Sequence, residues 1–103
     1  LKKRTQFQRV FSKGQAWHSN YFVCFYLPSK QQYVGFVASK KVGNAVKRNR
    51  SKRRLRALYR SAEESLKIGT YVFVAKQSLP DAPFPEINEA FITSLKRLKT
   101  LQR

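Results

Sequence analysis

The side chains best placed for chemistry in this 103-residue chain are its cations, which gather in one stretch. Ten of the 22 Lys and Arg residues lie between positions 40 and 60, and this stretch contains no Asp or Glu. All five acidic residues follow position 60, so the formal net charge of +17 is unevenly distributed. A Lys-rich stretch is often only a solvated surface, but cations confined in this way favour a binding surface for a polyanion. Nucleic acid is the first candidate partner, and an anionic membrane surface is the second.

Groups for acid–base, nucleophilic or metal chemistry are scarce. His18 is the only histidine, and a lone histidine among aromatic residues is usually structural. Cys24 is the only cysteine, so no internal disulfide can form, and a reducing cytoplasm is the expected compartment. The acidic residues form no pair placed for proton transfer and no cluster with metal-ligand spacing. We therefore expect no catalytic or metal-binding residue in this chain, and a stand-alone nuclease is disfavoured.

Composition and length limit the class of protein. A chain with 42% hydrophobic and 14% aromatic residues can build a core, and this length fits one domain over residues 1–103. No apolar run is long enough to span a membrane, and the N-terminal residues lack the apolar stretch of a signal peptide.

Hydrophobic periodicity predicts regular structure before the basic stretch. The predicted elements are a helix over residues 5–12, strands over residues 16–18 and 20–27, and a strand over residues 33–39. We expect strand 33–39 to pair antiparallel with strand 20–27, because only a short break separates them. Phe7 and Phe11 share one side of the first helix.

The basic stretch itself has helical periodicity from about Ala45 to the stop signal Gly69. Its apolar stripe consists of Leu55, Leu58, Tyr59, Ala62 and Leu66. Arg48 projects to the same side as this stripe, so we expect the first turn to overhang the edge of the sheet. That overhang would leave Arg48 and Lys52 available to a ligand. The cations expected to point toward solvent are Lys47, Arg50 and Arg54.

The rest of the chain completes the predicted fold. Residues 71–76 are apolar on both faces, as a central strand should be. Pro85 at the first helical position, followed by acidic residues, starts the final helix. The order helix, two or three strands, helix, strand, helix predicts an α+β sandwich with helices packed on a sheet.

Aromatic residues near the basic stretch are candidates for stacking on unpaired nucleotides. Alternation along strand 20–27 places Tyr21 and Phe25 on one face, opposite Phe22, Cys24 and Tyr26. Most aromatic residues of a domain this small must belong to the core, so the sequence leaves open which set faces a ligand.

The basic stretch also carries a specific motif. Residues 39–56, SKKVGNAVKRNRSKRRLR, closely resemble the RNR segment of the bacterial ribonuclease P protein subunit family. The segment FQRVF at residues 7–11, before Gly14, is similar to that family's first helix, and residues 71–76 are similar to its last strand. The resemblance covers nearly the whole chain, and its central motif is specific because it fixes Gly, Asn, Ala and Val among the charges.

The resemblance implies a fold and a function. The fold would be the family's α+β sandwich, like the second domain of ribosomal protein S5, with a left-handed βαβ crossover around the RNR helix. The protein would be the accessory subunit of a cytoplasmic ribonucleoprotein that removes the 5′ leader from precursor tRNA. Its partners would be the ribonuclease P RNA, which performs the hydrolysis with bound Mg²⁺, and the precursor tRNA. The alternative is a non-enzymatic, ribosomal-type binder of structured RNA on the same fold.

The resemblance also implies site residues. Those matching the RNR segment and its lead-in are Ser39, Lys40, Lys41, Arg48, Asn49, Arg50, Lys52, Arg53 and Arg56. We add Asn44 from within the motif and Arg60 from the same helix stripe as Arg53 and Arg56. Phe7, Phe11 and Phe25 match the aromatic positions of the cleft that holds the single-stranded leader, and Phe25 stands where a tyrosine is familiar. Tyr21 is added from strand alternation alone.

Overall fold

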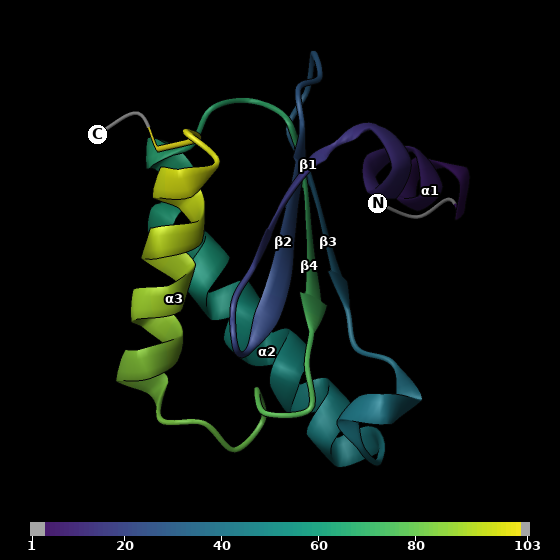
Figure 1. Ribbon diagram of the computed structural model, residues 1–103, viewed down its shortest axis with the longest axis vertical. Helices are drawn as coiled ribbons and strands as arrows, with labels where there is room; N and C mark the ends of the chain where they lie inside the picture. Colours follow the sequence, from purple (N-terminus) through teal and green to yellow (C-terminus); the bar gives the residue numbers. More distant parts are fainter. Residues whose placement is uncertain (1–3, 102–103) are drawn as a thin grey trace.

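The computed structural model describes residues 4–101 and shows a four-stranded sheet between helices (Figure 1). The elements are α1 (Arg4–Lys13), β1 (Gln15–His18), β2 (Phe22–Leu27), β3 (Tyr33–Val37), α2 (Ala45–Ala62), β4 (Thr70–Ala75) and α3 (Phe84–Arg97). Single 3₁₀ turns, η1 (Lys40–Val42) and η2 (Glu63–Ser65), flank α2. The predicted α+β class and element order are confirmed. Helix α3 begins one residue earlier than expected, which puts Pro85 in the second helical position.

The sheet has the strand order β1-β2-β4-β3, so the prediction that β3 pairs with β2 is wrong. Strand β4 lies between them, antiparallel to β2 and parallel to β3. The physical reason is burial: β4 is buried at five of its six residues, whereas β3 is mostly half-exposed. A strand that is apolar on both faces gains most from a central position, and β3 suits an edge. Helix α2 then forms the crossover between the parallel strands β3 and β4.

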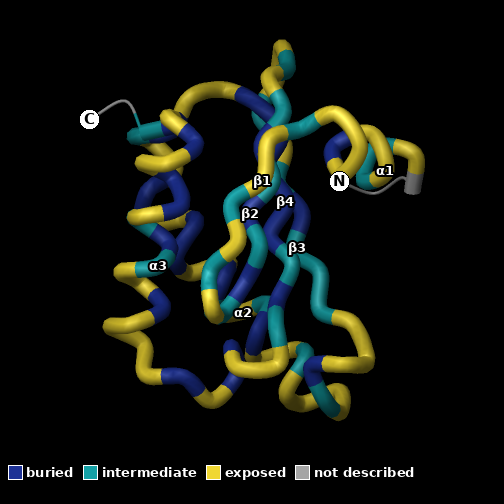
Figure 2. Tube along the Cα trace, viewed as in Figure 1, coloured by how far each residue is buried: buried dark blue, intermediate teal, exposed yellow. Residues whose placement is uncertain are grey.

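The main core lies between one face of the sheet and helices α2 and α3 (Figure 2). Alternate residues of β2 and β4 point into it, as the register Cys24↔Phe73 and Tyr26↔Tyr71 requires. Helix α2 supplies the predicted apolar stripe from Leu55 to Ala62, and the buried residues of α3 are Ile87, Phe91 and Leu95. The helix ends at Ala62 and not near Gly69 as predicted, so Leu66, although buried, lies in extended backbone after the turn η2. Burial of this stripe fixes the orientation of α2, and therefore decides which of its cations face outward.

The opposite face of the sheet carries α1, seen to the right of the strands in Figure 1. Val10 is the buried contact of this helix and is only 2% exposed. On this face Phe25 of β2 lies opposite Val72 of β4 in the antiparallel register. Because α1 is short, much of this face stays outside the main core. Within the described residues, no helix is long and apolar enough to cross a bilayer.

Candidate nucleic-acid interface

Two consecutive caps shape the start of the RNR segment, here defined as residues 39–56. The hydroxyl of Ser39 accepts a hydrogen bond from the Lys41 N–H at 3.3 Å, which caps η1. Gly43 then turns the chain with φ of 138°, a conformation that side chains disfavour. The side chain of Asn44 accepts from the Lys47 N–H at 3.0 Å and caps α2.

The first turn of α2 contains no acidic residue, although a helix N-terminus carries a partial positive charge. Lys47 and Arg48 add two formal positive charges at that end. The resulting repulsion is relieved by an anion, so the electrostatics of this turn favour a phosphate-bearing ligand.

Most of the sequence-predicted RNA-binding side chains project from the molecule. The exposed members are Ser39, Lys40, Lys41, Asn44, Asn49, Arg50, Arg53, Arg56 and Arg60. Arg48 and Lys52 are half-exposed, and neither side chain has a hydrogen-bond or ion-pair partner among residues 4–101. The first turns of α2 extend beyond the ends of the strands, as the sequence predicted (Figure 1). Arg48 is therefore not packed beneath the sheet.

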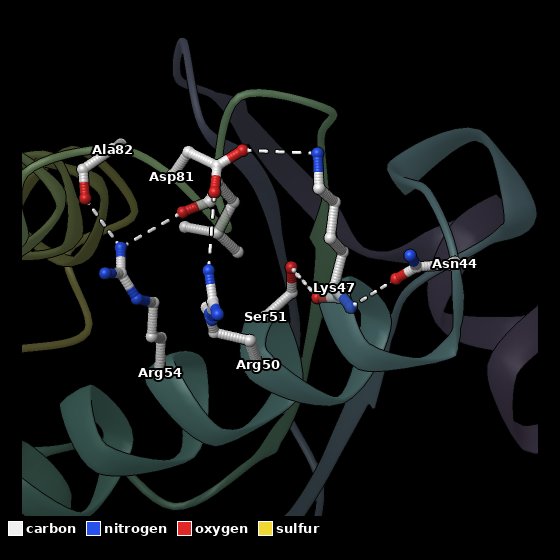
Figure 3. A network of polar contacts seen from close by, with 8 residues as sticks. Asn44, Lys47, Arg50, Ser51, Arg54, Asp81 and Ala82 are labelled. Carbon is white, nitrogen blue, oxygen red and sulfur yellow. Dashed lines mark hydrogen bonds and ion pairs between the residues drawn. The ribbon is translucent and has the colours of Figure 1, made fainter.

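One acidic side chain lies within this basic surface. Asp81, in the loop before α3, contacts the Nζ of Lys47 at 3.5 Å and the Nη1 of Arg50 at 3.4 Å (Figure 3). Its side chain is 61% exposed, so both ion pairs are screened by water. Lys47 and Arg50 thus point outward, as predicted, but toward a carboxylate that the sequence did not place beside them.

The prediction that Arg54 points toward solvent is wrong. Its Nη1 donates to the carbonyl oxygens of Leu79 at 3.2 Å and Ala82 at 2.6 Å (Figure 3). Neither carbonyl has a backbone partner in a described helix or strand. The Leu79 carbonyl accepts a 3.4 Å hydrogen bond from the Ala82 N–H within the loop, and the guanidinium on the adjacent flank of α2 donates to both carbonyls. Arg54 therefore joins α2 to the loop that carries Asp81.

Arg56 lies on the other flank of α2. Its guanidinium carbon is 5.5 Å from the centre of the Phe36 ring in β3, a cation–π geometry. The contact places the guanidinium of Arg56 over a ring at the sheet edge, and the residue stays exposed.

A hollow of about 610 Å³ lies beside the lead-in to the RNR segment. Ser39 and Lys41 line one side, and the end of β4 with Lys76 lines the other. The Nζ of Lys76 donates to the Ser19 carbonyl at 2.5 Å. Sequence reasoning did not single out Lys76, and no local pattern marks it, because its place beside Lys41 comes from the parallel pairing of β3 with β4.

Three of the four predicted aromatic site residues meet on the α1 face of the sheet. The ring centroids of Phe7 and Phe11 are 6.3 Å apart, and those of Phe11 and Phe25 are 4.9 Å apart in an edge-on arrangement. We call these residues the phenylalanine cluster. Phe11 is 42% exposed, and the other two rings are half-buried. The cluster therefore offers aromatic surface that is already held in place.

Tyr21 does not join this cluster. It precedes β2, in a turn where the Ser19 hydroxyl accepts from the Tyr21 and Phe22 N–H groups, so strand alternation does not extend to it. Its hydroxyl donates to Oε2 of Glu86 in α3 at 2.8 Å, which also raises its pKa. The face predicted for Tyr21 is therefore wrong, because its side chain packs toward α3 and the main core.

The described residues offer little for metal binding or catalysis. Among residues 4–101 no three His, Cys, Asp or Glu side chains gather closely enough to hold a metal ion. Cys24 is buried, as predicted, and burial raises the pKa of its thiol to about 12. His18 is exposed on the edge strand β1. The chemistry available at the surface is therefore that of cations and aromatic rings.

Comparison with known proteins identifies the family. The family model for ribonuclease P matches residues 1–99. The chain belongs to the ribonuclease P protein family. It is 50% identical over 99 residues to the ribonuclease P protein component of a Nitratiruptor species, covering 96% of this chain and 91% of that relative. The corresponding protein of Clostridioides difficile is 38% identical over 101 residues, with 94% and 89% coverage.

Solved structures of ribonuclease P proteins have the same fold. That of Staphylococcus aureus gives a TM-score of 0.88 at 29% identity and covers 98% of this chain and 95% of its own. That of Thermotoga maritima gives 0.81 at 27% identity, with 94% coverage of both chains. This chain is thus a protein component of the ribonuclease P endoribonuclease, and its family implies an RNA-binding role in tRNA processing.

Proposed function

We propose that this subunit binds the ribonuclease P RNA through the RNR segment and holds the single-stranded 5′ leader of precursor tRNA on the phenylalanine cluster. The observation that carries the proposal is that Phe11 contacts both Phe7 and Phe25, and that this cluster leaves aromatic surface exposed on the face that α1 only partly covers. Unpaired bases stack on such surface without regard to sequence. The RNR segment supplies salt-dependent attraction for RNA phosphates.

The division of labour follows from the side chains. Arg48, Lys52 and Arg53 are open to a ligand and can neutralise phosphates of a folded RNA. Leader stacking adds affinity only for the precursor, because mature tRNA has no leader. The subunit would therefore favour substrate over product, and phosphate neutralisation would lower the Mg²⁺ concentration that the ribonucleoprotein needs.

The described residues do not fit a Mg²⁺ site of their own. Asp81 is paired with two cations, Glu86 accepts from Tyr21, and no acidic cluster forms. We assign no metal-dependent step to this chain and propose that Mg²⁺ is held mainly by the RNA. We also propose a cytoplasmic location, in keeping with a buried, unpaired cysteine.

The test is reconstitution with a bacterial ribonuclease P RNA at low Mg²⁺. We expect the chain to stimulate leader cleavage, whereas a ribosomal-type binder would give none. The Phe7→Ala/Phe11→Ala variant should weaken precursor binding about tenfold to a hundredfold, because stacking contributes about 1–3 kcal/mol per base, and should spare mature tRNA. Phe84→Ala removes an aromatic ring of similar exposure from α3 and serves as the control. Equal loss for both tRNAs would refute leader binding at the cluster.

A further inference from the structure

A groove of about 450 Å³ lies between α1 and the turn that follows β2. It is separate from the phenylalanine cluster, because the two occupy opposite flanks of α1. Phe7 and Phe11 project to one flank, Arg9 and Lys13 project to the other, and buried Val10 lies between them against the sheet. A nucleic-acid strand on the cluster therefore cannot pass beneath α1 into the groove.

Three cations line this groove. Arg9 and Lys13 come from successive turns of α1, and Lys30 comes from the turn after β2. All three are exposed, none has a hydrogen-bond or ion-pair partner among the described residues, and the lining contains no acidic residue. Cations that converge without a counter-charge repel one another, so an anion bound between them lowers the electrostatic energy.

The neutral polar groups of the groove are already engaged. The Ser29 hydroxyl donates to the Gln31 carbonyl at 2.6 Å and shares a 3.1 Å hydrogen bond with the Thr70 hydroxyl. The Tyr33 hydroxyl donates to Oε1 of Gln31 at 2.7 Å. The charged side chains are therefore the principal donors to a ligand. Such donors recognise phosphate oxygens by charge and do not read the edges of bases.

The groove also lies far from the RNR segment. The turn after β2 is at the upper end of the molecule in Figure 1, and the first turn of α2 is at the lower end. The molecule extends 35 Å along its longest axis, so the groove and the first turn of α2 lie near its opposite ends.

We propose that this cationic groove, lined by Arg9, Lys13 and Lys30, is a second site for RNA phosphodiester backbone. The inference rests on the proposed function, since it assigns a further contact to the same RNA-binding subunit. It predicts recognition that is independent of base sequence and steeply dependent on salt. The backbone comes from either the catalytic RNA or the precursor tRNA, and both supply the same chemistry.

The first test compares two variants that each lose two positive charges. Arg9→Gln/Lys30→Gln removes groove cations, and the control Lys67→Gln/Lys96→Gln removes exposed lysines from elsewhere. In the reconstituted holoenzyme, the groove variant should lose about tenfold in RNA affinity. The slope of its plot of log affinity against log salt concentration should become shallower by about 1.5, since each lost phosphate contact reduces the magnitude of that slope by about 0.7–0.9. Equal behaviour of groove variant and control would overturn the proposal.

Two arms identify the source of the backbone. If the groove variant binds isolated ribonuclease P RNA more weakly, the groove contacts that RNA. If the variant weakens only the binding of precursor tRNA with a sufficiently long leader, the groove contacts the substrate. Either outcome supports the site. Arg53→Ala/Arg56→Ala in the same assay separates the two hypotheses. If this variant loses affinity and the groove variant does not, the groove inference alone fails; if neither loses affinity, the proposed function fails as well.

Discussion

The guanidinium of Arg54 donates a 2.6 Å hydrogen bond to the carbonyl oxygen of Ala82, and this contact sets Arg54 apart from its neighbours in the RNR segment. Arg53, the preceding residue, is exposed, and its side chain has no hydrogen-bond or ion-pair partner among residues 4–101. Adjacent arginines in the basic motif therefore have different roles. Arg54 connects the loop before α3 to α2, and Arg53 is available to bind RNA.

Replacing each arginine should separate these duties. Arg54→Ala should lower the free energy of unfolding by about 1–2 kcal/mol, because two backbone carbonyls lose a charged donor. Arg53→Ala should leave stability nearly unchanged and weaken RNA binding. Urea unfolding and RNA titration of both variants provide the comparison, and a stability loss confined to Arg53→Ala would contradict it.

The cap at Asn44 should support both stability and RNA affinity. Asn44→Ala removes the acceptor for the Lys47 N–H, so the first turn of α2 should fray at a cost of about 1 kcal/mol. RNA affinity should fall because that turn carries Arg48. Asn44→Ser keeps an acceptor and should retain most of both properties, while Asn88→Ala on exposed α3 surface should change neither. Thermal unfolding and RNA titration measure the two effects.

Asp81 should restrain RNA binding rather than assist it. Asp81→Asn removes the carboxylate paired with Lys47 and Arg50, so RNA affinity should rise about twofold to fivefold and its salt dependence should steepen. Stability should change by less than about 1 kcal/mol, because exposed ion pairs contribute little. Glu64→Gln, in η2, removes the same charge elsewhere and is the control. Weaker binding by Asp81→Asn would mean that the carboxylate orders its two partners for RNA.

Cys24 should be inert in the folded protein. Burial raises the pKa of its thiol to about 12, so very little thiolate exists at pH 8, and a thiol reagent should react only as the protein unfolds. The unfolded thiol loses its proton from about pH 9 upward. The contribution of this group to stability is therefore complete below pH 9 and declines as pH rises toward 12. Measuring the free energy of unfolding of the unmodified chain and of Cys24→Ala over this pH range isolates the contribution of the thiol. Rapid labelling of the thiol at pH 8 would disprove its burial.

Tyr21 should not affect discrimination between precursor and mature tRNA. Tyr21→Phe removes only an exposed hydrogen bond to Glu86, so the affinity ratio for the two tRNAs should stay unchanged. A fall in that ratio comparable to that of the Phe7→Ala/Phe11→Ala variant would show that the leader reaches this side of the sheet.

Much of the fold and of the site could be predicted from local patterns. The buried stripe of α2 and the meeting of Phe11 with Phe25 follow from periodicity, the quoted motif and the resemblance it carries. The pairing of β3 with β4 could not be predicted in this way, because nearness in sequence favours β2 and only the burial of β4 decides otherwise.

The missed site features arise from contacts that only the folded chain makes. Arg54 turns to the loop, and Asp81 reaches α2, because a segment about 30 residues further along the chain packs beside the helix. The prediction for Tyr21 fails because the Ser19 turn interrupts strand alternation. The groove had a weak signal, since Arg9 and Lys13 are four residues apart opposite the phenylalanines of α1. Its third cation, Lys30, becomes a neighbour only through folding.

The central place of β4 has a consequence for synthesis on the ribosome. Strands β1 and β2 can pair as soon as both have emerged, but β3 has no hydrogen-bonding neighbour until β4 follows α2 out of the exit tunnel. Until then the apolar stripe of α2 cannot pack against the complete sheet, although the basic RNR segment has already left the tunnel. A nascent chain that ends before residue 70 should stay unfolded around α2, so RNA recognition should begin only late in translation.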